Sequence, residues 1–548
     1  MSVAPDQVRV PDAVSRRLGW TFVRCAVPFS TVGVIAGWLE GVRLSLPTPS
    51  LVDDWFAIAY ARPAAHALFH GDYASAAVDF PGRYRPAYIA VWNYAQWHLF
   101  GDPSIATAAA WGVLRIALFL VAVWLLTAWL TGKRTTFRYP LLWLAPLAVA
   151  VTPATAVDLA RHSPSEPLMV AGLIIGLALV GAGLRTLLVD SGPGRRASAI
   201  TALVVGYPIY LFGVYSKETS IALLTFIPFF LKWLGPATRS RILESRKAKY
   251  LFGSSGLLIV APLLHLGVHL ASAVSGGADP YPDAHFSLGR RVIAAGILPL
   301  VGAPGPLETL LWLVGVPAAI AVTINMACKH ERGAWLVAGV LSTGFLMSAF
   351  ALALGETPSR YYIPWVVAVA AVVVQSLVRA KIGLQIAAVA IVLGVAFSGT
   401  QDVMAGWLRT ERSGSTAVEM AKGVVRADCP LYLANFDVER RVAIGQLLKF
   451  GSATPVQRCV PGSKLAYALE WHEATLPVGF AHRCRSGWQQ LEARNRVRLY
   501  RCQVFAGSHF LDQDEASSKP DVVIVQLRVT RHAPNPRNLF RSSSRLTG

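Results

Sequence analysis

The stretch Val113–Leu130, VLRIALFLVAVWLLTAWL, decides the fold class, because Arg115 is its only charged residue. A second stretch, Leu168–Leu184, LMVAGLIIGLALVGAGL, carries no charge at all. A bilayer core about 30 Å thick is crossed by a helix of roughly 20 apolar residues. Such uninterrupted apolar runs predict helices that span a membrane.

The composition of the whole chain agrees with this prediction. Of the 548 residues, 54% are hydrophobic and 15% are charged, whereas soluble chains carry roughly a quarter charged residues. The formal net charge of +20 by itself could indicate nucleic-acid binding. Many Lys and Arg residues instead lie in short segments between apolar blocks, as in cytoplasmic loops. We therefore expect no nucleic-acid partner.

Apolar blocks and basic clusters together predict a membrane domain of about eleven spanning helices in residues 20–397. Arginines at 9, 16, 17 and 24 lie before or at the start of the first span, so residues 1–19 are expected to be cytoplasmic. The expected spans are 20–46, 105–130, 139–151, 168–188, 200–215, 220–234, 250–274, 306–327, 335–354, one ending at 379, and 382–397. The long outer segment 47–103 should have structure of its own.

The tail after the last span should lie outside, because the number of spans is odd. Four cysteines occur there, Cys429, Cys459, Cys484 and Cys502. Disulfides need an oxidising compartment, which also favours an outside location, although three pairings are possible. Four free thiols in a cytosolic domain are the alternative.

The tail also has the signals of a small α/β or α+β domain over residues 398–533. Leu431–Ala434 and Val522–Leu527 are typical of strands, and Val438–Phe450 is typical of a helix. The last segment, 534–548, is polar and basic and is expected to be disordered.

Candidate functional residues gather at the predicted outer turns. Asp53 and Asp54 follow the first span in SLVDDWF. Adjacent acids at a membrane surface are costly unless they pair, bind a cation or exchange protons. The alternative is a pair of solvated acids at a helix N-terminus.

Other outer turns add charged and aromatic side chains. Arg85, in GRYRP, could bind a phosphate as a rigid fork of donors or lie in an interfacial belt. The remaining candidates are Glu166 with Arg161 and His162, then Lys217 with Glu218, and finally Arg360 with Tyr361. An ion pair between neighbours is the simple account of Lys217 and Glu218. Several helices could instead converge these charges into one cavity.

His265 and His269 are four residues apart and therefore share one helical face. This spacing suits a metal ion, but a pair of histidines without an acidic third ligand is more often part of a core or an interface. Asp53, Asp54, His265 and His269 are the candidate metal ligands, and the metal itself is unknown.

These motifs, in this order and on one side of the membrane, resemble the GT-C superfamily of membrane glycosyltransferases, close to the protein O-mannosyltransferase and aminoarabinose-transferase type. The resemblance covers roughly residues 20–380. Its elements are Asp53-Asp54, Tyr84-Arg85-Pro86, Ser165-Glu166-Pro167, Lys217-Glu218 and Arg360-Tyr361 with Pro364.

The resemblance implies that a sugar moves from a polyprenyl-phosphate donor to a glycan, lipid or protein acceptor at the outer membrane face, with inversion. It implies that Asp53 or Asp54 is the base or a metal ligand, and that Arg360 contacts the donor phosphate. Lys217 and Arg85 would assist Arg360, and Glu166, Glu218, Tyr361 and His162 would support the site. Some family members use a divalent metal ion and others do not.

Three alternatives stay open on the sequence. A transporter or flippase of lipid-linked saccharides would place charges near the bilayer midplane, and an O-antigen ligase or polymerase would rely on a late outer loop. A structural or sensor protein would leave the charged set unexplained. We expect an integral protein of the bacterial inner (plasma) membrane, with the N-terminus in the cytoplasm and the C-terminal domain outside.

Overall fold

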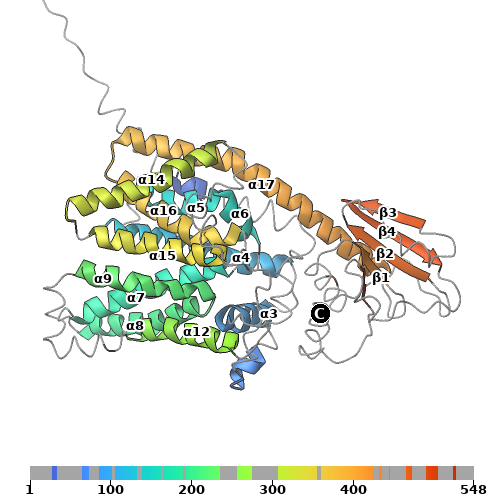
Figure 1. Cartoon of the computed structure of the whole chain (residues 1–548), viewed down its shortest axis with the longest axis horizontal. Helices are drawn as coiled ribbons and strands as arrows, with labels where there is room; N and C mark the ends of the chain where they lie inside the picture. The colour runs from blue at the N-terminus through green and yellow to red at the C-terminus, as the bar shows by residue number, and fades with distance from the viewer. Residues whose placement is uncertain are drawn as a thin grey trace, which may run out of the picture.

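The computed structural model describes residues 27–31, 33, 65–72, 85–100, 105–132, 139–161, 165–188, 193–234, 253, 256–274, 306–331, 333–353, 359–424, 431–434, 444, 465–471, 489–503 and 522–525. These residues form a bundle of helices and a separate β-sheet, which one long helix, α17, connects (Figure 1). The sheet has five strands.

The helical elements follow the chain in a regular succession. They are η2 (Ala87–Asn93), α3 (Tyr94–Phe100), α4 (Ile105–Leu130), η3 (Pro140–Trp143), α5 (Leu144–Val151), α6 (Pro153–Ala160), α7 (Glu166–Leu188), α8 (Pro193–Val214), η4 (Glu218–Thr225), α9 (Phe226–Leu234), α12 (Leu257–Val274), α14 (Pro306–Cys328), α15 (Gly333–Ala353), η6 (Ser359–Tyr362), α16 (Ile363–Leu377) and α17 (Ile382–Val424).

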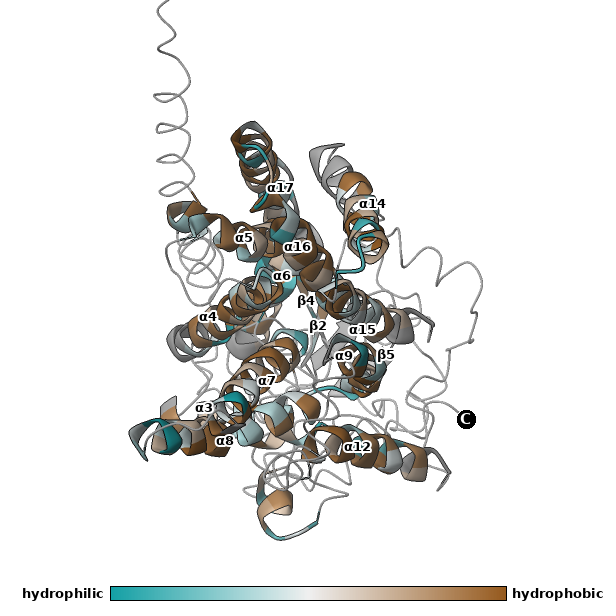
Figure 2. Cartoon of the chain, turned by 90° about the vertical axis from the view of Figure 1, so that its left-hand side faces the viewer, coloured by the Kyte–Doolittle hydropathy of each residue, from teal (hydrophilic) through white to brown (hydrophobic). Residues whose placement is uncertain are grey.

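Helix α16 lies at the centre of the bundle (Figure 2). Its sequence, IPWVVAVAAVVVQSL, consists mainly of Val and Ala, and most of its residues are buried. Helices α4, α5, α14 and α15 pack around it. A helix that is apolar on all sides is expected inside a large core or a membrane domain. The brown surfaces of the outer helices in Figure 2 show that apolar residues also face outward.

Helices α7 and α8 approach each other at glycine contacts. A Cβ atom on Gly172 would lie 2.6 Å from the Cα of Gly213, and a Cβ on Gly176 would lie 2.5 Å from the backbone nitrogen of Tyr210. Small residues let membrane helices pack backbone to backbone, which gains dispersion energy where lipid offers no hydrophobic driving force. This contact holds α8, and the turn that follows it, against α7.

Several helices coincide with the predicted spans. Helix α4 begins and ends at the predicted residues 105 and 130, and α14 and α15 begin and end within two residues of prediction. By length and composition, four helices of the described part could each cross a membrane: Trp111–Leu130, Glu166–Leu187, Pro193–Val214 and Ile382–Ala421. Shorter apolar helices cover much of the other predicted spans. The total of eleven spans stays a prediction.

The predicted end of the last span at Phe397 is not the end of its helix, because α17 continues to Val424. Hydropathy falls after Phe397, but no proline interrupts the chain there. The distal part of α17 packs against strands of the sheet, and Thr416, Ala417 and Val418 are buried. Tertiary contacts thus extend a helix beyond its apolar segment.

The sheet has the strand order β3-β4-β2-β1-β5. Its strands are β1 (Leu431–Ala434), β2 (Leu465–Trp471), β3 (Gln489–Arg494), β4 (Val497–Gln503) and β5 (Val522–Val525). Only β1 and β2 are parallel. Leu469 and Leu499 oppose each other across β2 and β4 and are buried on one face. β1 and β5 lie where strands are expected, whereas the helix predicted at 438–450 falls outside the described residues except for Ile444.

Candidate functional site

The centre of the candidate site is the turn between α8 and η4, which carries Lys217 and Glu218. The Ser216 hydroxyl donates to the Phe212 carbonyl at 2.6 Å, and the Ser220 hydroxyl donates to the Val214 carbonyl at 2.7 Å. These bonds satisfy carbonyls at the end of α8, which lack helical partners. The turn is therefore held from both sides, and Lys217 and Glu218 are buried within the protein.

Glu218 pairs with Arg85, which lies just before η2. Nε and Nη2 of Arg85 each donate to one carboxylate oxygen of Glu218 at 2.7 Å. The backbone amide of Ala87 also donates to the Tyr215 carbonyl at 3.3 Å, which joins η2 to the turn. A two-pronged contact of this kind fixes the orientation of both side chains.

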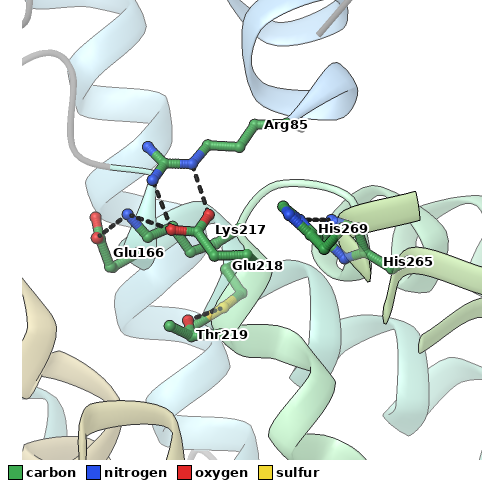
Figure 3. Close-up of polar contacts among 8 residues, drawn as sticks. Arg85, Glu166, Lys217, Glu218, Thr219, His265 and His269 are labelled. Atoms are coloured by element: carbon green, nitrogen blue, oxygen red, sulfur yellow. Dashed lines mark hydrogen bonds and ion pairs between the residues drawn. The ribbon is translucent and has the colours of Figure 1, made fainter. Parts of the chain in front are cut away.

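Lys217 lies between two carboxylates and an aromatic ring. Its Nζ is 3.0 Å from Oε1 of Glu166 and 3.6 Å from Oε1 of Glu218. It also lies 4.7 Å from the centre of the Tyr361 ring. Figure 3 shows Arg85, Glu166, Lys217 and Glu218 converging from separate parts of the chain. We call these four residues and Tyr361 the ion cluster.

The ion cluster is buried and its formal charges balance, with two cations and two anions. The charged side chains are between 1% and 8% exposed. Isolated charges would be very costly in this setting, so each must be matched by an opposite charge. Arranged in this way, the cluster holds two fixed cations in a low-dielectric environment, where they act strongly on any developing negative charge nearby.

The two histidines of α12 form a hydrogen-bonded pair beside the turn. Their Nε2 atoms are 3.2 Å apart, and Nδ1 of His265 is 3.4 Å from the Ser220 hydroxyl oxygen. Because Ser220 gives its proton to Val214, the proton between Ser220 and His265 belongs to Nδ1 of His265. The Nε2 of a neutral His265 then accepts a proton from His269. This arrangement satisfies both rings as part of a packed interface.

Within the described ranges, no group of three His, Cys, Asp or Glu residues could hold a metal ion. The metal-ligand role of His265 and His269 therefore stays a prediction. Asp53, Asp54 and His162, the other predicted members of the site, lie outside the described residues.

Of the other predicted residues, Arg85, Glu166, Lys217, Glu218 and Tyr361 meet in the ion cluster. The backbone of Arg360 is described in η6, next to Tyr361. The functional roles of all these residues stay predictions.

Sequence reasoning missed which charges pair. It suggested that Lys217 and Glu218 neutralise each other, whereas Glu218 has its closest contacts with Arg85, and Lys217 lies closest to Glu166. It also assigned no role to Arg115, although a single charge within an apolar block is a signal of function.

Comparison with known proteins supports the fold. No protein-family model matches the chain, and no curated protein matches it either. Two crystal structures of ArnT from Cupriavidus metallidurans are similar to it, one in the apo state and one bound to undecaprenyl phosphate. The apo structure has a TM-score of 0.52 at 14% identity over 89% of this chain and 98% of ArnT.

The lipid-bound structure has the same TM-score of 0.52 at 15% identity, over 88% of this chain and 98% of ArnT. The likeness extends over nearly the full length of both chains. Together with the apolar helices, it shows a polytopic integral membrane protein with a GT-C-like fold.

Proposed function

We propose that this protein is a glycosyltransferase that moves a sugar from a polyprenyl-phosphate donor to an acceptor at the outer membrane face. The GT-C-like fold supports this proposal, because one of the similar ArnT structures holds undecaprenyl phosphate. The donor class would then be shared, while the sugar and the acceptor can differ.

The ion cluster is the observation that carries the proposal. Four charged side chains from three separate parts of the chain meet below 10% exposure, beside the predicted outer ends of the helices. Protein stability alone is a poor reason for such a cluster, because apolar residues of similar volume are often as stable. A requirement for cations near a phosphate gives it a function.

The proposed reaction is an inverting transfer. Asp53 or Asp54 accepts the proton of the acceptor hydroxyl while the acceptor oxygen attacks the anomeric carbon. The bond from the sugar to the phosphate breaks, and negative charge grows on the leaving lipid phosphate. Arg360, assisted by Lys217 and Arg85, stabilises that charge. A divalent ion at the aspartates would provide further stabilisation.

Tyr361 and the two glutamates would orient the cations in this scheme. Lys217 is held by Glu166, Glu218 and the Tyr361 ring, so its ammonium group has little freedom to move. Fixed cations need no reorganisation when the phosphate charge develops, which is the main source of electrostatic catalysis.

The central experiment compares envelope glycans of a deletion strain with strains complemented by variants. Asp53→Ala and Asp54→Ala are expected to abolish sugar transfer while expression stays normal. Asp402→Ala, at an exposed aspartate of α17, is the matched control and should restore the glycan fully. Wild-type glycans in both Asp53→Ala and Asp54→Ala strains would remove these acids from the mechanism.

A second experiment concerns the donor. Arg360→Ala should weaken the use of the lipid-phosphate donor, measured as a raised KM in an assay with purified protein. Arg379→Ala, at an exposed arginine, is the control and should leave the KM unchanged. The same assay in the presence of EDTA tests for a divalent ion. Movement of intact lipid-linked saccharide without transfer would favour the transporter alternative.

A further inference from the structure

Arg115 is a fully buried arginine that the proposed reaction does not use. It lies in α4, is 1% exposed and is among the largest fully buried side chains of the described residues. A charged side chain within a membrane-spanning helix is costly unless other groups of the protein satisfy it. Its contacts therefore indicate what it does.

The guanidinium of Arg115 binds the C-terminal end of α6. Its Nη2 donates to the carbonyls of Asp158 at 3.2 Å, of Leu159 at 2.9 Å, and of Arg161. The last carbonyls of a helix have no helical partner and carry the negative end of the helix dipole. A cation from another helix thus provides the cap that the sequence of α6 lacks.

The end of α6 is also braced by its own side chains. Nη1 of Arg161 lies 3.7 Å from Oδ1 of Asp158, whose side chain is 1% exposed. Helix α6 has only eight residues and begins at a proline. So short a helix has little stability of its own, and its position depends on contacts at its ends.

Helix α6 connects Arg115 to both sides of the ion cluster. Five positions after Arg161 the chain reaches Glu166, which pairs with Lys217. Helix α6 also packs directly against η6, which carries Tyr361 under the same ammonium group. Displacement of the end of α6 would therefore move two of the groups that hold Lys217.

We propose that Arg115 is a positioning residue, which fixes the end of α6 and thereby places Glu166 and Tyr361 around Lys217. Its importance for catalysis rests on the proposed function, whereas its effect on the geometry of the cluster does not. A flat guanidinium can reach several carbonyls at once, which the single ammonium of a lysine does less well.

The test uses the full-length protein in detergent, with the variants Arg115→Met and Arg115→Lys. Arg379→Met is the matched control, because that guanidinium is 63% exposed. Two properties are measured: affinity for undecaprenyl phosphate, and hydrogen exchange of the amides at the start of α7 and in η6. The amide of Met169, which donates to the Ser165 carbonyl at 2.9 Å, reports on the first turn of α7.

Arg115→Met should weaken lipid-phosphate binding about tenfold, which corresponds to one strong contact, and should speed exchange in both segments. Arg115→Lys should recover part of both properties, and Arg379→Met should change neither. In a double-mutant cycle, Glu166→Gln should add little to the effect of Arg115→Met, because both act on Lys217. If Arg115→Met does not fold, Arg115→Lys with slower recovery of neither property would decide against the proposal.

Unchanged exchange in both segments, or fully additive effects in the cycle, would overturn the role of Arg115. A different result separates this inference from the proposed function. If the wild type binds no undecaprenyl phosphate, the proposed function fails, while the exchange measurements still show whether Arg115 places the cluster.

Discussion

Two ion-paired regions of this protein have nearly the same distances and opposite surroundings. In the ion cluster, Arg85 and Glu218 are 2.7 Å apart and are 6% and 8% exposed. Between the sheet and α17, Arg494 and Glu419 are 2.9 Å apart and are 49% and 43% exposed. The difference teaches that the distance between charges does not set their importance, since water and salt screen only the second pair.

The two regions also differ in what else holds them together. Next to the exposed pair, the Asn495 side chain donates to the Thr416 hydroxyl at 2.8 Å, so the hairpin stays attached to α17 without the pair. In the ion cluster each charge is the main partner of another, and the loss of one leaves a buried charge unbalanced. The effects of substitutions should therefore separate the two regions clearly.

The largest effect is expected for Arg85→Met. It removes one cation and leaves Glu166 and Glu218 to share Lys217, so folding stability should fall by about 3–5 kcal/mol. The measurement is SDS-induced unfolding of the purified protein in mixed micelles. A loss similar to that of an exposed arginine would mean that water reaches the cluster and that the contrast between the two regions is wrong.

A smaller loss is expected when both partners are replaced, in Arg85→Met combined with Glu218→Leu. This double variant stays electrically balanced, because Lys217 and Glu166 still form a pair. Its stability should return to within about 2 kcal/mol of the wild type, because apolar residues often replace a buried pair without penalty. Sugar transfer should nevertheless remain impaired, which would separate the functional from the structural role. Equal losses in the single and double variants would contradict this account.

The smallest effect is expected for Arg494→Met. An exposed pair contributes at most about 1 kcal/mol, and the contribution should shrink further at high salt. Unfolding of the wild type and the variant at low and high ionic strength provides the comparison. A loss as large as that of Arg85→Met would show that the contact between the sheet and α17 is as sensitive as the ion cluster.

Much of the helical fold is predictable from local sequence. The apolar run of α4 and the loops rich in Lys and Arg depend on residue type alone, and α4 has the predicted bounds. The end of α17 was not predictable in this way. Beyond Phe397 the chain is polar enough to end a span, yet contacts with β2 and β4 keep it helical.

The candidate site was predictable as a list of residues but not as a set of contacts. Charges at outer turns stand out because they interrupt apolar runs, which is how Glu166, Lys217 and Glu218 were found. Their partners depend on how helices pack, and Arg85 lies 133 positions from Glu218. Arg115 was missed for the same reason, since the carbonyls it binds belong to another helix.

By itself, the sequence determined that this protein crosses the membrane several times, because the transfer of apolar side chains out of water depends mainly on composition and run length. It also determined that charged residues collect at a few turns. The tertiary structure decided which of those charges meet, how they balance, and where a long helix ends. Those outcomes depend on distances between groups far apart in the chain, and electrostatic energy depends on distance and on burial, neither of which a local pattern contains.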